Sequence, residues 1–333
     1  MAAYLKAMRR GVVGLAMLTA TALPALAEEI EISNYGVGTN GMPYGVALAK
    51  GYFKEFGIDI TGIRSSPGGA PTIRNLLAGN LSFGEAGLTA IVAAIRGGAD
   101  IKIIAETCNT TAEIGWVVRH DSPVKTIQDL KGRRIGFTNP NSTTHALALM
   151  LLEAAGYKPT DATTLSTGGF GPGLAALEHG ELDVAPFAEP LYAQSKGKYR
   201  LLAWSTDVLP PMVDVLAITT ERAIKARPDF LRAMLKARRK AVEFMNSNPR
   251  ESAGLIAKDY KVDVDVAEAV IRKLLKKETR ANLPYWGPGQ IHLDTLKNLM
   301  HGQTLLGHTV GEVDWSKMID ESFLPDDQRS KKQ

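Results

Sequence analysis

The sequence is poor in several features that define common protein classes. It has a single cysteine, Cys108, so no internal disulfide can form and stability must come from a buried core. After residue 27 it has no apolar run that approaches the roughly 20 residues of a membrane span. Basic and acidic residues are interspersed, which argues against a nucleic-acid-binding protein. No His, Cys or carboxylate spacing is that of a metal site, and none is that of a catalytic triad.

The first 27 residues have the pattern of a secretory signal peptide. A positive segment (residues 6–10) precedes an apolar one (residues 11–23), and Ala25-Leu26-Ala27 matches a cleavage motif. Three of the 39 Lys and Arg lie in this leader and all 35 Asp and Glu follow it, so cleavage lowers the formal charge from +4 to +1. We therefore expect a monomeric periplasmic protein that begins near Glu28. A membrane anchor is the alternative interpretation of the apolar segment.

Strands and helices are expected to alternate along the rest of the chain. Residues 30–32, 58–60, 81–83 and 101–105 read as strands with helices between them, and the alternation restarts at Trp116. This pattern predicts an α/β protein with two lobes, each a mostly parallel sheet flanked by helices. After the strand at residues 215–219 the pattern is almost entirely helical, and we expect this part to pack on the first lobe. The predicted organisation is a signal peptide (1–27), a first lobe (28–115 and 216–333) and an inserted second lobe (116–215).

Three segments resemble a known family. They are residues 45–60, with Gly45-Val46-Ala47-Leu48-Ala49-Lys50-Gly51-Tyr52-Phe53 and Gly57-Ile58-Asp59-Ile60; residues 129–136; and residues 175–184. In order and spacing they are similar to segments of the nitrate/sulfonate/taurine-type ABC substrate-binding proteins, a family that includes binding proteins for thiamine-precursor pyrimidines. The resemblance implies the two-lobed type II periplasmic-binding-protein fold, with a cleft between the lobes that closes on a small organic ligand. It implies an ABC permease in the inner membrane as partner, and no catalytic residue, cofactor or metal.

The residues expected to contact the ligand lie in loops that follow strands. Ligands of open α/β sheets bind beyond the carboxyl ends of the strands, where the N–H groups of the following helices favour acceptor or anionic groups. These loops are rich in Gly, Ser, Thr and Asn. The predicted ligand-binding residues are Tyr35, Asn40, Gly41, Met42, Ser66, Gly68, Gly69, Glu85, Ala86, Asn139, Ser142, Thr143, Gly169, Phe170 and Glu189. One residue of Asn141, Ser142 and Thr143 is expected to cap the helix that follows them.

Glu85 bears on the chemistry of the ligand. It follows the expected strand 81–83, within the expected loop Gly84-Glu85-Ala86-Gly87. An ionised Glu85 facing the cleft would disfavour a simple anion such as nitrate, because burying it unpaired is costly. The ligand would then need a donor or positive charge as well as an acceptor, as in an amino-sulfonate, an amino acid or a pyrimidine-like ring. The alternative is that Glu85 faces solvent or pairs with a Lys or Arg.

Other residues and other functions stay open at this point. His145 and His179 are predicted to be surface or supporting residues, and Lys273–Lys277 the solvated face of a helix. Trp286 either borders the cleft or fixes the helical tail. One alternative function is a secreted enzyme on the same fold acting on a pyrimidine-like substrate, which needs titratable groups that converge in the cleft. Yeast-type pyrimidine-synthase enzymes of this fold carry a cysteine-rich motif that this chain lacks. A ligand-sensing domain of a membrane receptor is a further alternative.

Overall fold

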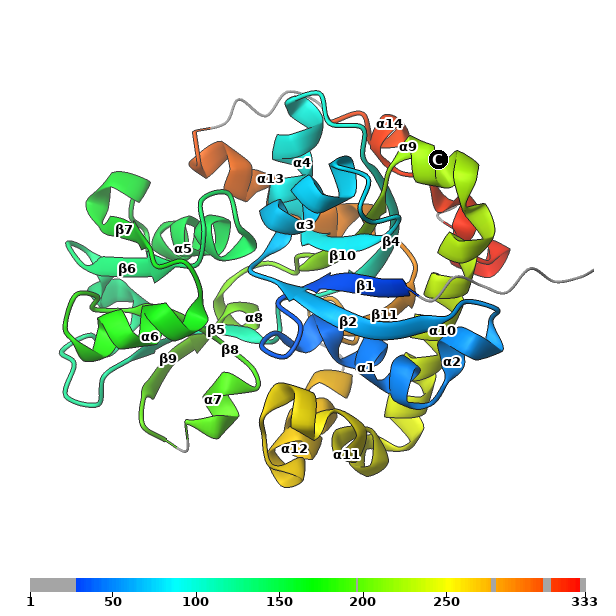
Figure 1. The fold of residues 1–333 in the computed structure, drawn as a ribbon. Coiled ribbons are helices and arrows are strands. Elements are labelled where there is room, and N and C mark those ends of the chain that lie inside the picture. Colours follow the sequence, from blue (N-terminus) through cyan, green and yellow to red (C-terminus); the bar gives the residue numbers. More distant parts are fainter. Residues whose placement is uncertain (1–27, 196, 277–279, 308–312, 330–333) are drawn as a thin grey trace, which may run out of the picture.

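Two α/β lobes make up the described part of the chain (Figure 1). The computed structural model describes residues 28–195, 197–276, 280–307 and 313–329, so the expected signal peptide lies outside it. Within these residues no helix is both long and apolar enough to cross a membrane.

The first lobe is built on a sheet with the spatial order β2-β1-β3-β10-β4-β11. Hydrogen-bonded ladders join β1 to β2 and join β3, β10, β4 and β11 in turn, and β1 lies beside β3. Their bounds are β1 Glu28–Ser33, β2 Ile60–Ser66, β3 Gly84–Gly87, β4 Lys102–Cys108, β10 Val215–Thr219 and β11 Trp286–Gly289. Apolar residues such as Ile30 and Ile32 alternate with charged ones along β1, as expected for a strand that buries one face.

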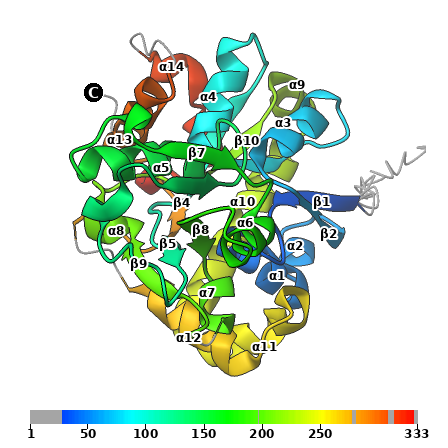
Figure 2. The ribbon, with the colours of Figure 1, turned by 90° about the vertical axis from the view of Figure 1, so that its left-hand side faces the viewer.

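The second lobe repeats this arrangement with the order β7-β6-β8-β5-β9. Ladders join β6 to β7 and join β8, β5 and β9, and a parallel bridge between Ile135 and Val184 links β6 to the segment before β8. The bounds are β5 Ile114–Val118, β6 Arg134–Phe137, β7 Thr163–Ser166, β8 Ala185–Ala188 and β9 Arg200–Trp204. Figure 2 shows this lobe nearest the viewer.

The sheets are mixed, because antiparallel strands lie among the mostly parallel ones expected from the sequence. β10 is antiparallel to β3 and to β4, β11 is antiparallel to β4, and β5 is antiparallel to β8 and to β9. β5 and β10 are the first strands after the chain crosses from one lobe to the other. A parallel strand ends at the boundary between the lobes, whereas a strand that follows a crossing starts there, so it runs in the opposite direction. The sequence pattern located both strands but contains no information on their direction.

Helices cover both faces of the sheets. The longer ones are α1 Met42–Ala49, α3 Gly69–Leu77, α4 Leu88–Arg96, α5 Thr143–Ala154, α6 Phe170–Glu178, α10 Pro228–Ser247, α11 Pro249–Tyr260, α12 Val264–Leu275 and α13 Leu293–Leu305. The shorter ones are α2 Tyr52–Glu55, α7 Leu191–Gln194, α8 Ser205–Val208, α9 Glu221–Ala226 and α14 Trp315–Met318, with 3₁₀ turns that include η1 Thr39–Gly41, η2 Ile127–Leu130, η4 Glu321–Phe323 and η5 Asp326–Gln328. Proline at the first positions of α10 and α11 starts these helices without loss of a hydrogen bond.

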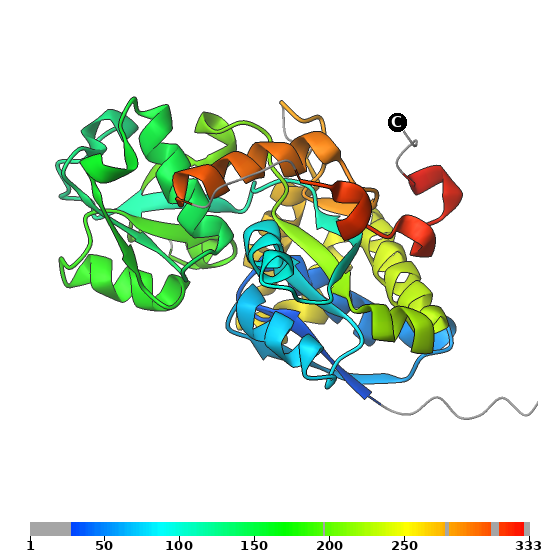
Figure 3. The ribbon, with the colours of Figure 1, turned by 90° about the horizontal axis from the view of Figure 1, so that it is seen from above.

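The C-terminal helices do more than cover the first lobe. α10 packs on α1 and α2 and shares a hydrophobic core with β1 and β4. However, α13 packs against α5 of the second lobe, and Figure 3 shows it reaching across to that lobe. A Cβ at Gly302 would lie 2.7 Å from the Ala146 Cβ, so glycine permits this close approach. One hydrophobic cluster therefore includes residues of both lobes, among them Trp116 and Leu299.

Candidate functional site

The starts of three helices from both lobes meet at one place. A Cβ at Gly69, at the start of α3, would lie 3.4 Å from the Gly87 nitrogen, at the start of α4. A Cβ at Gly87 would lie only 2.5 Å from Thr143 Oγ1, at the start of α5. We call this place the loop junction and define it by Gly68, Gly69, Gly87, Asn139 and Thr143. Four of these five residues were predicted from the sequence to contact ligand, and the structure brings them together.

The caps of these helices leave backbone N–H groups at the loop junction. Gly68 and Gly87 are the N-cap residues of α3 and α4, and neither helix start receives a side-chain cap. α5 differs, because Ser142 Oγ accepts from the His145 N–H at 3.2 Å. The prediction that one residue of this segment caps the helix is thus confirmed for Ser142. Uncapped helix starts carry partial positive charge and unpaired donors, which suit an anionic or acceptor group.

One contact between the lobes and two within the first lobe stabilise the loop junction. The Asn139 side-chain amide donates to the Pro67 carbonyl at 3.5 Å, so this second-lobe loop touches the loop after β2. Ser66 Oγ lies 2.5 Å from Thr72 Oγ1 and 3.3 Å from the Gly68 carbonyl. The Ser66 side chain therefore stabilises the loop between β2 and α3. Gly68 has a φ of 116°, a conformation that favours glycine.

The loop after β7 adjoins the start of α5. The Thr138 carbonyl accepts from the Gly168 N–H at 2.7 Å and from Ser166 Oγ at 3.2 Å. Gly169 is the N-cap of α6, without a side-chain cap, and Phe170, the first residue of α6, is buried. Thr138 also contacts Ser142, because its Oγ1 donates to Ser142 Oγ at 3.1 Å. Thr138 therefore links the loop that precedes Gly169 and Phe170 to the start of α5.

Glu85 lies elsewhere than the sequence predicted. Residues 84–87 are the strand β3 itself, and residues 81–83 precede it without strand structure. Glu85 is opposite Ala217 of β10 and has no exposed surface. The expected loop is thus a central strand, because its small residues fit between β1 and β10. Ala86, also predicted to bind ligand, is fully buried on the same strand.

Three side chains occupy the two carboxylate oxygens of Glu85. Tyr44 Oη donates to Oε1 at 2.7 Å, and the Asn40 amide donates to Oε2 at 3.0 Å. Arg238 Nε lies 3.9 Å from Oε1, and both side chains are almost completely buried. This is the alternative in which Glu85 pairs with an arginine, and the prediction that it is available to an amine-bearing ligand is not supported.

The other predicted residues of the first loop lie against α11. Tyr35 Oη donates to Asp259 at 2.5 Å, and burial raises the pKa of this tyrosine. A Cβ at Gly41 would lie 2.9 Å from the Tyr260 hydroxyl, and Met42 is a fully buried core residue. Their contacts are internal to the first lobe.

Glu189 joins the lobes. It follows β8, is only 3% exposed, and accepts from Lys273 Nζ of α12 at 2.9 Å. The same ammonium group lies 3.1 Å from the centre of the Trp204 ring, at the end of β9. Burial lowers the pKa of Lys273 although Glu189 opposes this effect. Of the stretch expected to form a solvated helix face, Lys273 is thus half-buried and paired, Lys276 is exposed, and Lys277 lies outside the described residues. Figure 2 shows α12 directly beside α7 of the second lobe.

The remaining singled-out residues have structural roles. His145 stacks on Phe137 with ring centres 3.7 Å apart, and His179 is exposed at the end of α6. Trp286 is buried, and its indole N–H donates to the Thr39 carbonyl at 3.0 Å, so it fixes the C-terminal part to the first lobe. Among the described residues, no group of three or more His, Cys, Asp or Glu side chains is arranged to hold a metal ion.

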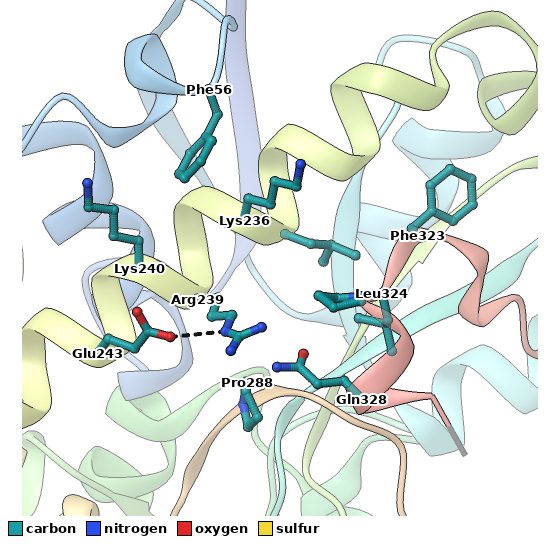
Figure 4. Close-up of a pocket in the computed structure, with 11 residues that line it drawn as sticks. Phe56, Lys236, Arg239, Lys240, Glu243, Pro288, Phe323, Leu324 and Gln328 are labelled. Atoms are coloured by element: carbon teal, nitrogen blue, oxygen red, sulfur yellow. Dashed lines mark hydrogen bonds and ion pairs between the residues drawn. The ribbon is translucent and has the colours of Figure 1, made fainter. Parts of the chain in front are cut away.

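A surface pocket of about 350 Å³ lies away from the loop junction (Figure 4). Residues of α10 line it together with η4 and η5, and its apolar wall includes Phe323 and Leu324. Two of its cations already have carboxylate partners, because Arg239 pairs with Glu243 at 3.0 Å and Lys240 with Glu55 at 2.5 Å. These pairs reduce the net charge that the pocket offers to an anion.

Comparison with known proteins gives a family match and curated relatives. The NMT1/THI5 like family model matches residues 38–252. A protein of Escherichia coli (strain K12) whose name assigns it aliphatic-sulfonate binding is 29% identical over 203 residues, which are 58% of this chain and 60% of that protein. The riboflavin-binding protein RibY of Chloroflexus aurantiacus is 22% identical over 309 residues, 89% of this chain and 80% of that protein.

Solved structures support the fold. The periplasmic aliphatic sulphonate binding protein SsuA of Escherichia coli has a TM-score of 0.69 and 22% identity, covering 88% of this chain and 91% of that one. The alkanesulfonate-binding protein SsuA of Xanthomonas axonopodis pv. citri, bound to MOPS, has a TM-score of 0.72 and 20% identity, covering 93% and 100%. A cysteine-to-serine mutant of DszB in complex with biphenyl-2-sulfinic acid has a TM-score of 0.59 and 15% identity, covering 89% and 97%. Together they confirm the two-lobed periplasmic-binding-protein fold predicted from the sequence.

Proposed function

The chain belongs to the NMT1/THI5-like family, and from this premise we propose that it is a periplasmic solute-binding protein that delivers a small organic ligand to an ABC importer. The names of the relatives support binding rather than turnover. In this proposal the protein is a monomer whose signal peptide is removed after Ala27. Its lobes comprise residues 28–115 with 216–333, and residues 116–215, and an inner-membrane permease receives the ligand.

The meeting of three helix starts at the loop junction carries this proposal. α3 and α4 belong to one lobe and α5 to the other, so a ligand held there contacts both lobes and favours their closed arrangement. The uncapped starts of α3 and α4 favour an acceptor or anionic group such as a sulfonate or carboxylate. With Glu85 paired to Arg238, an amine on the ligand is not required. In this proposal Asn139 and Thr143 are the side chains that bind it.

An enzyme on the same fold is the second candidate, and Cys108 is the residue that would support it. The DszB neighbour is a cysteine-to-serine mutant bound to a sulfinic acid. In this chain, however, Cys108 is fully buried in β4, and burial raises the pKa of its thiol well above the usual value. A buried neutral thiol is a poor nucleophile. Binding without chemistry therefore agrees better with the site.

A thermal-shift screen with matched compounds tests the proposed function. The panel pairs alkanesulfonates and carboxylates with alcohols of the same length, and includes taurine, nitrate, riboflavin and pyrimidines. A ligand at 100 times its Kd stabilises the fold by about 2.7 kcal/mol, a shift of a few degrees for a chain of this size. We expect the shift with organic anions and not with their alcohols. If alcohols stabilise the fold as well as the anions do, the helix starts do not bind the ligand.

Gly87→Ala tests the place of binding. Its Cβ would lie 2.5 Å from Thr143 Oγ1, so the Thr143 side chain or the start of α5 must shift. We expect at least tenfold weaker binding of the best anion, measured by calorimetry. Gly254→Ala in α11 is the matched control, because a Cβ there meets nothing within 4 Å. The control should bind normally; equal affinities of both variants would remove the loop junction from the site.

A further inference from the structure

Two short segments cross between the lobes, and each ends in a buried carboxyl group. Residues 109–113 join β4 to β5, and residues 209–214 join α8 to β10. Glu113 and Asp214 are the last residues of these crossings, 5% and 4% exposed. The two side chains lie within hydrogen-bonding reach of each other. A hydrogen bond between two carboxyl groups requires a proton on one of them.

Both carboxyl groups also have partners that belong to the lobes. Glu113 Oε2 accepts from the Thr39 N–H at 3.0 Å and from the Thr39 hydroxyl, and Tyr285 Oη donates to Asp214 at 3.4 Å. The Glu113 carbonyl accepts from the Glu189 N–H of the second lobe at 3.0 Å. The pair thus lies where the two crossings, η1, the segment before β11 and the end of β8 meet.

The charges around this pair disfavour two ionised carboxylates. Glu85 of β3 adds negative charge, and the neutral groups that face the pair are Cys108, Tyr260 and Tyr285. Two cations from helices packed on the first lobe have other partners: Arg238 of α10 lies by Glu85, and Lys273 of α12 pairs with Glu189. Burial raises the pKa of both Glu113 and Asp214, and the charge of Glu113 raises that of Asp214 further.

We propose that Glu113 and Asp214 share one proton that ties the two crossings together and makes the hinge between the lobes responsive to pH. While the proton is present, a hydrogen bond joins the crossings. When it is lost, two carboxylates repel each other at the point about which the lobes must rotate. This proposal concerns the hinge and is independent of the identity of the ligand, so it can fail while the proposed function holds.

The shared proton has a definite thermodynamic signature. Above the ordinary pKa of an aspartic acid, about 4, the unfolded chain has released the proton while the folded chain retains it. Stability from this source is therefore complete below about pH 4 and is lost as the pH rises through the raised pKa of the pair. In that window the folding equilibrium constant falls about tenfold per pH unit, because one proton is bound only in the folded state.

Asp214→Asn and Glu113→Gln are the decisive variants. Each can keep a hydrogen bond between the crossings but carries no shared proton. We expect the radius of gyration of the wild-type full chain, measured by small-angle scattering without ligand, to increase as the pH rises from 5 to 9. Both variants should give a constant value, and their unfolding constants should lack the tenfold dependence. Glu106→Gln, a buried carboxyl of β4 paired with His292, is the control and should keep the wild-type scattering profile.

A measurement on the unmutated protein covers the case in which the variants do not fold. Infrared difference spectra of protein labelled with ¹³C-aspartate report protonated aspartic acid directly. We expect a protonated carboxyl signal at pH 6 that disappears at higher pH together with the change in scattering. No protonated carboxyl at pH 6 in protein labelled in turn with ¹³C-aspartate and ¹³C-glutamate, or an identical pH profile of scattering in wild type and Asp214→Asn, would overturn the proposal.

Discussion

Two regions of the molecule, the sheet of the first lobe and the crossings between the lobes, bury carboxyl groups with different partners. Glu85 lies within a strand and has an arginine and two neutral donors around it. Glu113 and Asp214 end the crossings and have each other. An arginine keeps its charge at every pH of interest, whereas a second carboxyl group compensates charge only while a proton is shared. Burial alone therefore does not determine what a carboxyl group does. Its partner determines whether the interaction is independent of pH, as for Glu85, or depends on a proton, as for Glu113 and Asp214.

Of the substitutions that test this comparison, removal of Arg238 should lower the free energy of unfolding most. Arg238→Met leaves Glu85 buried without its cation and deprives the Gly287 carbonyl of a donor at 2.7 Å. Breaking a buried ion pair from one side costs about 3–5 kcal/mol. We expect a loss of this size in the free energy of unfolding measured with denaturant. Arg239→Met, which breaks a solvent-exposed pair with Glu243, is the control and should cost at most about 1 kcal/mol. Equal losses would mean that Glu85 does not depend on its cation.

Glu85→Gln should have a smaller effect and separates a structural from a ligand-binding role. The amide can still accept from Tyr44 or Asn40 but no longer compensates Arg238, so we expect a loss of about 1.5–3 kcal/mol, the range for hydrogen bonds to charged groups. Calorimetry with matched ligands that bear or lack an amine should show the same affinity change for both. A selective loss for the amine-bearing ligand would return Glu85 to the ligand site.

The smallest effect is expected at Glu106, a further buried carboxyl group, whose partner is a histidine. His292 donates its backbone N–H to Glu106 at 2.8 Å, and the hydrogen bond from its ring raises the pKa of His292. Stability from the charged ring is complete below the ordinary pKa of histidine, about 6.5, and is lost as the pH rises through the raised value. His292→Gln should reduce stability by about 1 kcal/mol at pH 6 and by less at pH 8.5. A difference that grows with pH would contradict this account.

The sequence predicted much of the fold but not the direction of two strands. Apolar periodicity and glycine or proline signals located the alternating elements, and crossings were expected at the predicted lobe boundaries, after residues 115 and 215. Gly84-Glu85-Ala86-Gly87 was misassigned as a loop, because its composition is that of a loop and only the neighbouring strands β1 and β10 make it a strand. The direction of β5 and β10 follows from where the chain crosses, which no local pattern records.

The candidate site was predicted in part for a similar reason. Loops that follow strands were expected to lie near one another, and at the loop junction Gly68, Gly69, Asn139 and Thr143 do so. Partners that come from distant helices were missed, because nothing in the local sequence pairs Arg238 with Glu85 or Lys273 with Glu189. Glu113 and Asp214 lie far apart in the sequence, and only the expected crossings hinted that they are neighbours.

Small-angle scattering with and without ligand tests the central claim most directly. The claim is that a small organic anion binds between the lobes and holds them together. With the anion that gives the largest thermal shift, at saturation and at a pH where the apo protein is most open, we predict a smaller radius of gyration than without it. The Gly87→Ala variant should show no such decrease at the same ligand concentration. A radius of gyration that does not change when calorimetry shows the wild-type protein to be saturated would contradict the account.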